Sequence, residues 1–133
     1  MPRTEVFFFC EANRQSPILE WLIDLSTRDR QAFANCMARL RLLKVFGHEL
    51  RRPAADYLEN GIYELRAKKG TVQYRLLYFF HGRNVAIVAH GLIKQEIVPA
   101  RDITRAVERK RRYEEDPTKH RCPQAIEDID PTA

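Results

Sequence analysis

The stretch between residues 62 and 92 constrains the fold most strongly, because its side chains alternate with a period of two. Three runs rich in strand-forming residues, 62–67, 72–80 and 85–92, are joined by short connections that contain glycine. Such connections are typical of antiparallel hairpins. The middle run is apolar at both odd and even positions, which predicts a central strand covered on both faces. We therefore expect an antiparallel meander of three strands.

The residues before the meander predict one strand and two helices. Residues 4–9 are rich in strand formers. Ser16-Pro17 and Ser26-Thr27 are helix-start signals, and apolar residues at helical spacing follow each of them up to Gly47. Residues 48–60 are expected to form a connecting loop.

Pro99 opens a last helix with a narrow apolar stripe and many arginines. The order strand, helix, helix, three strands, helix predicts an α+β fold. We expect a small antiparallel sheet with two N-terminal helices packed on it and a C-terminal helix. With the helices on one face, the other face or the rim at the hairpin turns would be left for a ligand.

Charge is distributed unevenly along the 133 residues, a length that suits one compact domain. Residues 114–133 carry six carboxylates and two basic residues, a net charge of −4; since the whole chain carries +5, residues 1–113 carry +9. A basic body suggests a polyanionic partner such as nucleic acid. We expect one domain over residues 1–113 and a disordered acidic tail over 114–133, either solvated or lying across the basic body to weaken its binding.

The three cysteines, Cys10, Cys36 and Cys122, are far apart and form no CxxC pair. They are expected to be reduced thiols, as in a cytoplasmic protein, and the early charges at the N-terminus are unlike a secretory signal. No apolar run approaches the roughly 20 residues that span a bilayer, so no membrane partner is expected. The histidines show no ligand spacing, and we expect neither a metal nor a cofactor.

The hairpin between the first two strands of the meander brings two arginines together. Alternation places Glu64 and Arg66 on one face, and the short turn at 68–70 can bring Arg66 close to Arg75. Two neighbouring guanidinium groups need an anion between them. That anion is either Glu64, which would make a structural charge network, or a bound phosphate.

His90 lies on the third strand, with Val88 and Leu92 as its expected neighbours on the same face. A histidine in such a strand is either a hydrogen-bonded structural residue or a catalytic one. Lys94 lies just beyond the strand and could overhang the same edge of the sheet.

Three segments carry a resemblance to a known family: YELR at 63–66, YRLLYFF at 74–80 and HGLIK at 90–94, followed by Pro99. In this order and spacing they resemble the phage-derived HigB branch of the RelE/ParE toxin superfamily. The resemblance covers about residues 4–112. The family usually has a second lysine and an aromatic residue where this chain has Gln95 and Leu92, which leaves an inactive or retargeted member as an alternative.

The resemblance implies a RelE-like fold and a type II toxin, normally silenced by an antitoxin that is itself a helix-turn-helix DNA-binding protein. It also implies an endoribonuclease, an mRNA interferase that cuts the message in the ribosomal A site. Cleavage would use the 2′-hydroxyl of the RNA to attack the adjacent phosphodiester, without a metal or cofactor.

In that reaction Arg75 aligns with the arginine of the YR motif and would stabilise the phosphorane, because a guanidinium matches phosphate oxygens and stays charged. Arg66 and Lys94 would be further phosphate contacts. Glu64 or His90 would be the base. Tyr63 or Lys94 would be the proton donor, although alternation places Tyr63 on the face opposite Glu64. Four further basic residues are expected to contact the RNA: Lys68, Lys69, Arg101 and Arg105.

Two other functions compete with the nuclease. A ParE-like protein of the same fold would bind DNA gyrase and cut nothing itself. A basic nucleic-acid-binding module would use the helical strip 105–112 without catalysis. The YELR, YR and HGLIK elements favour the HigB-like nuclease.

Overall fold

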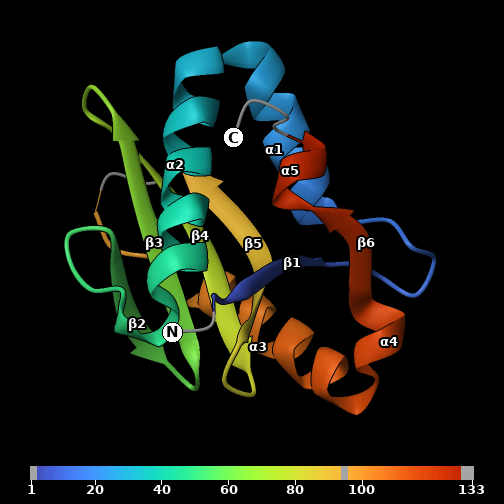
Figure 1. The fold of residues 1–133 in the computed structure, drawn as a ribbon. Helices are drawn as coiled ribbons and strands as arrows, with labels where there is room; N and C mark the ends of the chain where they lie inside the picture. The colour runs from blue at the N-terminus through green and yellow to red at the C-terminus, as the bar shows by residue number, and fades with distance from the viewer. Residues whose placement is uncertain (1–2, 94–95, 130–133) are drawn as a thin grey trace.

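The computed structural model describes residues 3–93 and 96–129 and confirms the α+β architecture. A six-stranded, mostly antiparallel sheet has the strand order β2-β3-β4-β5-β1-β6. Helices α1 and α2 pack on one face of this sheet, and α3 packs on the other (Figure 1). None of the helices in the described ranges is long and apolar enough to cross a membrane.

The N-terminal elements are one strand and two helices, and a capping residue marks the start of each helix. They are β1 (Glu5–Phe9), α1 (Pro17–Arg28) and α2 (Arg30–Phe46). The Ser16 hydroxyl accepts from the Leu19 amide at 3.2 Å and caps α1, as predicted. The predicted second start at Ser26-Thr27 is wrong. Both hydroxyls donate to the Ile23 carbonyl inside α1, and Asp29 caps α2 by accepting from the Ala32 amide at 3.1 Å.

The meander is confirmed as β3 (Ile62–Lys69), β4 (Val72–His81) and β5 (Val85–Ile93). The predicted loop 48–60 is wrong in its second half, because β2 (Ala55–Glu59) pairs with β3 as an edge strand. The segment is too short and too charged to show a clear alternation. Strand β1 pairs in parallel with β5, with Val6 opposite Ala86, and so lies inside the sheet.

A β-bulge in β5 redirects the side chains near its end. Leu77 pairs with His90 whereas Tyr78 pairs with Val88, so β5 carries one extra residue at Ala89. Val88 consequently packs in the core under α1 and α2, while His90 faces α3. The expectation that Val88 and His90 share a face is therefore wrong, because uninterrupted alternation cannot anticipate a bulge.

Both faces of the sheet carry an apolar core. The helix α3 (Ala100–Glu115) covers the second face through Ala106 and Tyr113, with Ile103 and Val107 packed beside them. This corrects the expectation that all helices lie on one face. It also agrees with the apolar character of both faces of β4, which needs cover on each side.

Residues 114–129 contain helices and a strand, whereas the composition of residues 114–133 predicts a disordered tail. Helix α3 continues to Glu115, past the predicted boundary at 113/114, and is followed by short elements on the edge of β1. These are α4 (Pro117–His120), β6 (Arg121–Ala125) and α5 (Ile126–Ile129). The buried side chains of Cys122 and Ile126 supply apolar cover that the low average hydrophobicity of the segment conceals.

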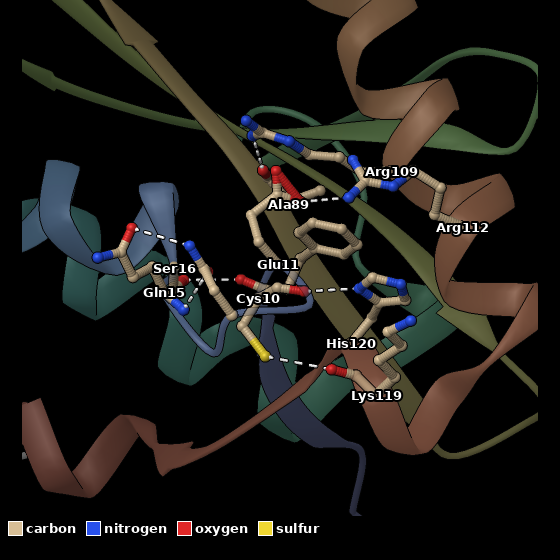
Figure 2. A network of polar contacts seen from close by, with 11 residues as sticks. Cys10, Glu11, Gln15, Ser16, Ala89, Arg109, Arg112, Lys119 and His120 are labelled. Atoms are coloured by element: carbon tan, nitrogen blue, oxygen red, sulfur yellow. Dashed lines mark hydrogen bonds and ion pairs between the residues drawn. The ribbon is translucent and has the colours of Figure 1, made fainter.

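Figure 2 shows how this segment is held to the N-terminal strand. His120 Nδ1 donates to the Cys10 carbonyl at 2.8 Å, and the Cys10 amide donates to the His120 carbonyl at 2.9 Å. The His120 ring stacks on Phe9 with a centroid separation of 5.1 Å. Arg112 donates to Glu11 at 2.7 Å beside them. Polar contacts therefore join the segment after β1 to α3 and α4, and among these residues Cys10 and His120 are buried.

Candidate functional site

The predicted site residues lie in two neighbouring rows that run across β3, β4 and β5. One row is Glu64, Leu77 and His90, and the next is Arg66, Arg75 and Leu92. Residues opposite one another across a sheet share a face, and this is the face on which α3 packs. The hairpin thus brings Arg66 and Arg75 together on one side, as its spacing predicts.

Arg75 is closed off from solvent in a buried ion pair. Its Nη1 lies 3.1 Å from Glu64 Oε1, and each side chain is 6% exposed. Its Nη2 donates to the Glu96 carbonyl, while Nε is buried without a hydrogen-bond partner. Of the two anions that could neutralise Arg75, the structure therefore shows the carboxylate. Arg75 is a fixed, buried group that also contacts the backbone at Glu96.

Arg66, by contrast, is half-buried, and within the described ranges its guanidinium forms no hydrogen bond or ion pair. Its charge acts on the Asp56 carboxylate. Hydrogen bonds from Arg52, at 2.6 and 2.9 Å, lower the pKa of Asp56 below its ordinary value, and the charge of Arg66 adds a smaller lowering. Arg66 is therefore available to an added anion.

His90 forms a close contact that the sequence analysis missed. Its Nε2 lies 2.7 Å from Asp102 Oδ1 in the first turn of α3, and the two side chains are 15% and 16% exposed. Burial lowers the pKa of His90 below its ordinary value; the hydrogen bond to Asp102 opposes this, while Arg109 and Arg105 add to it. A neutral imidazole held by a carboxylate is the arrangement expected of a general base.

Gly91, the second residue of HGLIK, has a packing role. A Cβ atom at this position would lie 2.6 to 2.9 Å from ring carbons of Trp21 on α1. Only glycine therefore lets α1 approach β5 this closely. Part of the motif is thus required by the fold and not by chemistry.

The remaining predicted residues fall in different places. Lys68 is exposed on the same side as Arg66, opposite Gln73. Lys69 points to the other face and pairs with Asp29 at 2.9 Å. Arg101 and Arg105 are exposed on α3, and Lys94 lies outside the described residues.

The described part of the chain contains no group of three or more His, Cys, Asp or Glu side chains that could hold a metal ion. The three cysteines are free and buried, and burial raises the pKa of Cys36 to about 12. A thiol with so high a pKa is a poor nucleophile at neutral pH.

A comparison with protein-family models finds a match. The family model described as "Phage derived protein Gp49-like (DUF891)" matches residues 20–111, from α1 to the last turns of α3. The matched region includes all the predicted site residues and leaves out β1 and the C-terminal β6. No curated protein matches the chain.

Proposed function

The chain belongs to the Gp49-like family of phage-derived proteins, a family of the toxin–antitoxin toxin type, and we propose that it is an endoribonuclease acting on mRNA at the ribosome. A toxin of this type implies an antitoxin partner. We propose that the chain acts in the ribosomal A site and cleaves the mRNA there. We further propose that the antitoxin is a helix-turn-helix DNA-binding protein.

The proposed reaction uses the RNA itself as nucleophile. The 2′-oxygen attacks the adjacent phosphorus and loses its proton to a base. The bond from phosphorus to the 5′-oxygen breaks, and that oxygen takes a proton as it leaves. The products are a 2′,3′-cyclic phosphate and a 5′-hydroxyl. The protein must therefore supply a base, an acid and positive charge for the phosphorane.

We assign the phosphate contact to Arg66. Its uncommitted guanidinium can form paired hydrogen bonds to two phosphate oxygens, and exposed Lys68 adds positive charge on the same side. Arg75 then acts as a positioning residue, since its buried pair with Glu64 fixes the strand that faces Arg66. Lys94 remains a candidate for a further phosphate contact or for the acid.

We assign the base to His90. Glu64 is already committed to Arg75. His90 Nε2 is held by Asp102, which leaves Nδ1 to take the proton, and its lowered pKa keeps the imidazole neutral at physiological pH. Asp102 orients the ring and stabilises the imidazolium that forms.

The observation that carries the proposal is the placement of Arg66, Arg75, Glu64 and His90 in two adjacent rows on one face of the sheet. Inducing the chain in a bacterium that lacks its antitoxin, and mapping new RNA 5′ ends, tests it. We expect growth arrest with cuts in register with codons. Arrest with DNA-damage signals and intact messages would identify a gyrase-directed toxin. Absence of arrest would leave a binding module or an inactive toxin.

A further inference from the structure

A cavity of about 440 Å³ lies at the outer edge of the sheet, beside the edge strand β2. It has no part in the mechanism described above. Its lining combines aromatic rings with one guanidinium and one carboxylate: His48, Leu50, Arg51, Asp56, Tyr57 and Tyr63. This combination is suited to a flat ligand that also forms hydrogen bonds.

The rings of the cavity are held in place yet accessible. Tyr57 is 53% exposed, and its hydroxyl accepts from the Gly61 amide at 3.1 Å. The Tyr57 ring meets Tyr63 edge to face, with centroids 5.0 Å apart. Exposed His48 stacks on Phe80 with a centroid separation of 3.6 Å. An added planar group can therefore stack without displacing the rings from the core.

The polar groups of the cavity retain unused hydrogen-bonding capacity. Arg51 donates through Nη1 to the carbonyls of His48 and Leu50, and its Nε and Nη2 make no hydrogen bond to any described residue. Asp56 uses Oδ2 for Arg52, and its Oδ1 accepts from the Tyr57 amide at 3.0 Å. A carboxylate oxygen can accept a second hydrogen bond, so Oδ1 remains available.

The edge itself is poorly suited to pairing with a strand of another protein. Strand β2 has five residues, two of them acidic, and its register shifts between Tyr57 and Glu59. Short, charged and irregular edges resist the addition of a strand. This favours a small planar group as the occupant of the cavity.

The cavity adjoins the proposed phosphate contact. Asp56 lines it and is the cross-strand partner of Glu64, and the charge of Arg66 acts on the Asp56 carboxylate. Exposed Arg52 is paired with Asp56 at 2.6 Å. A single RNA strand that places a phosphate at Arg66 can therefore reach the cavity with a neighbouring base by passing over the edge of the sheet.

We propose that this cavity binds a nucleobase of single-stranded RNA, stacked on Tyr57, and that it prefers guanine. Unpaired bases are commonly recognised by stacking on aromatic rings together with hydrogen bonds to the base edges. Guanine offers O6 and N7 as acceptors for Arg51 and N–H donors for Asp56, whereas adenine lacks the O6 acceptor. The inference rests on the proposed function in taking RNA as the ligand, and it would make the cavity a source of codon preference.

Titrating the isolated, full-length protein with the four nucleoside monophosphates while following its ring signals by NMR tests this. We expect GMP to shift the signals of Tyr57, Tyr63 and His48 at lower concentration than AMP, CMP or UMP. Tyr57→Ala should weaken GMP binding about 5- to 150-fold, the loss expected for one stacked base. Tyr57→Phe, which keeps the ring, should bind nearly as wild type.

Two further variants sharpen the test. Phe46→Ala removes an equally exposed ring outside the cavity and should leave binding unchanged. Arg51→Lys should abolish the preference for GMP over AMP, because the planar fork that reads O6 and N7 is lost. Equal shifts with all four nucleotides and with ribose 5-phosphate would mean phosphate binding alone and overturn the proposal. Ring-signal shifts that appear only when the antitoxin is added would also overturn the proposal.

This experiment is independent of cleavage. Base-selective binding by a protein that leaves messages intact in cells would retain the cavity's role and exclude the nuclease. The opposite result is also distinguishable. If Tyr57→Ala left the codon preference of cleavage unchanged and no nucleotide shifted the ring signals, the nuclease function would stand and the cavity's role would be excluded.

Discussion

Arg75 and Glu64 form an ion pair shielded from solvent, with Arg75 Nη1 3.1 Å from Glu64 Oε1 and each side chain 6% exposed. The burial of the pair predicts that Arg75→Ala destabilises the fold, because the variant would leave the Glu64 carboxylate buried without its partner. We expect a loss of about 3–5 kcal/mol in the free energy of unfolding, measured by urea denaturation.

The matched control is the double variant Glu64→Leu with Arg75→Met, which removes both charges and keeps side-chain volume. It should be clearly more stable than Arg75→Ala. If Arg75→Ala unfolds at the same urea concentration as wild type, the pair is not the structural element that we describe.

Arg66→Ala should abolish most RNA cleavage without unfolding the protein. The guanidinium is half-buried and has no partner in the described ranges, so its removal leaves no charge stranded. Loss of one positioned cationic contact typically reduces the rate about 10²–10³-fold. Cleavage of a message in a purified translation system measures the effect. Arg83→Ala, an exposed arginine in the turn between β4 and β5, is the control and should cleave normally.

Cleavage should depend on the protonation of His90. The pKa of His90 is lowered from its ordinary value of 6.5, so the neutral, basic form persists at lower pH than for a free histidine. We expect the acidic limb of the pH–rate profile to fall below pH 6.5. Asp102→Asn removes a contact that raises this pKa, so the limb should move to still lower pH while the maximal rate decreases.

His90→Gln provides the comparison for that experiment. It should lose the acidic limb together with most of the activity. A profile for Asp102→Asn with an unmoved limb would show that Asp102 only ties α3 to β5. The 15N chemical shifts of the imidazole, recorded on the protein without RNA, report the tautomer independently of cleavage.

Gly91→Ala should destabilise the fold, because the added Cβ would meet the Trp21 ring at 2.6 to 2.9 Å. Overpacking of this kind typically costs about 1–3 kcal/mol in the free energy of unfolding. Thermal unfolding measures the loss. Combining Gly91→Ala with Trp21→Leu should recover part of it, and the absence of any recovery would place the origin of the loss elsewhere.

The elements that the sequence predicts well are those with strong local signals. The meander follows from alternation and glycine turns, and α1 follows from Ser16 and Pro17. The features it does not predict depend on distant contacts. Tertiary packing fixes the parallel pairing of β1 with β5, the placement of α3 on the second face and the formation of β6. The two edge strands, β2 and β6, are short and show no clear alternation of apolar and polar residues.

The same distinction applies to the candidate site. Alternation correctly places Arg66 and Arg75 on one face, since their register depends only on the hairpin. It does not indicate that Arg75 is buried, because its cover comes from a loop 21 residues later in the chain. Asp102 was missed for a related reason: it meets His90 only because a bulge turns that residue toward α3.

The pairing of β1 also affects the order in which the chain can fold during synthesis. Its two neighbours, β5 and β6, are both translated long after it, so the first strand leaves the ribosome without any partner. The hairpins of β3, β4 and β5 form from neighbouring segments, whereas such distant pairings form slowly. The sheet is therefore completed only after β6 has been synthesised and can pair with β1.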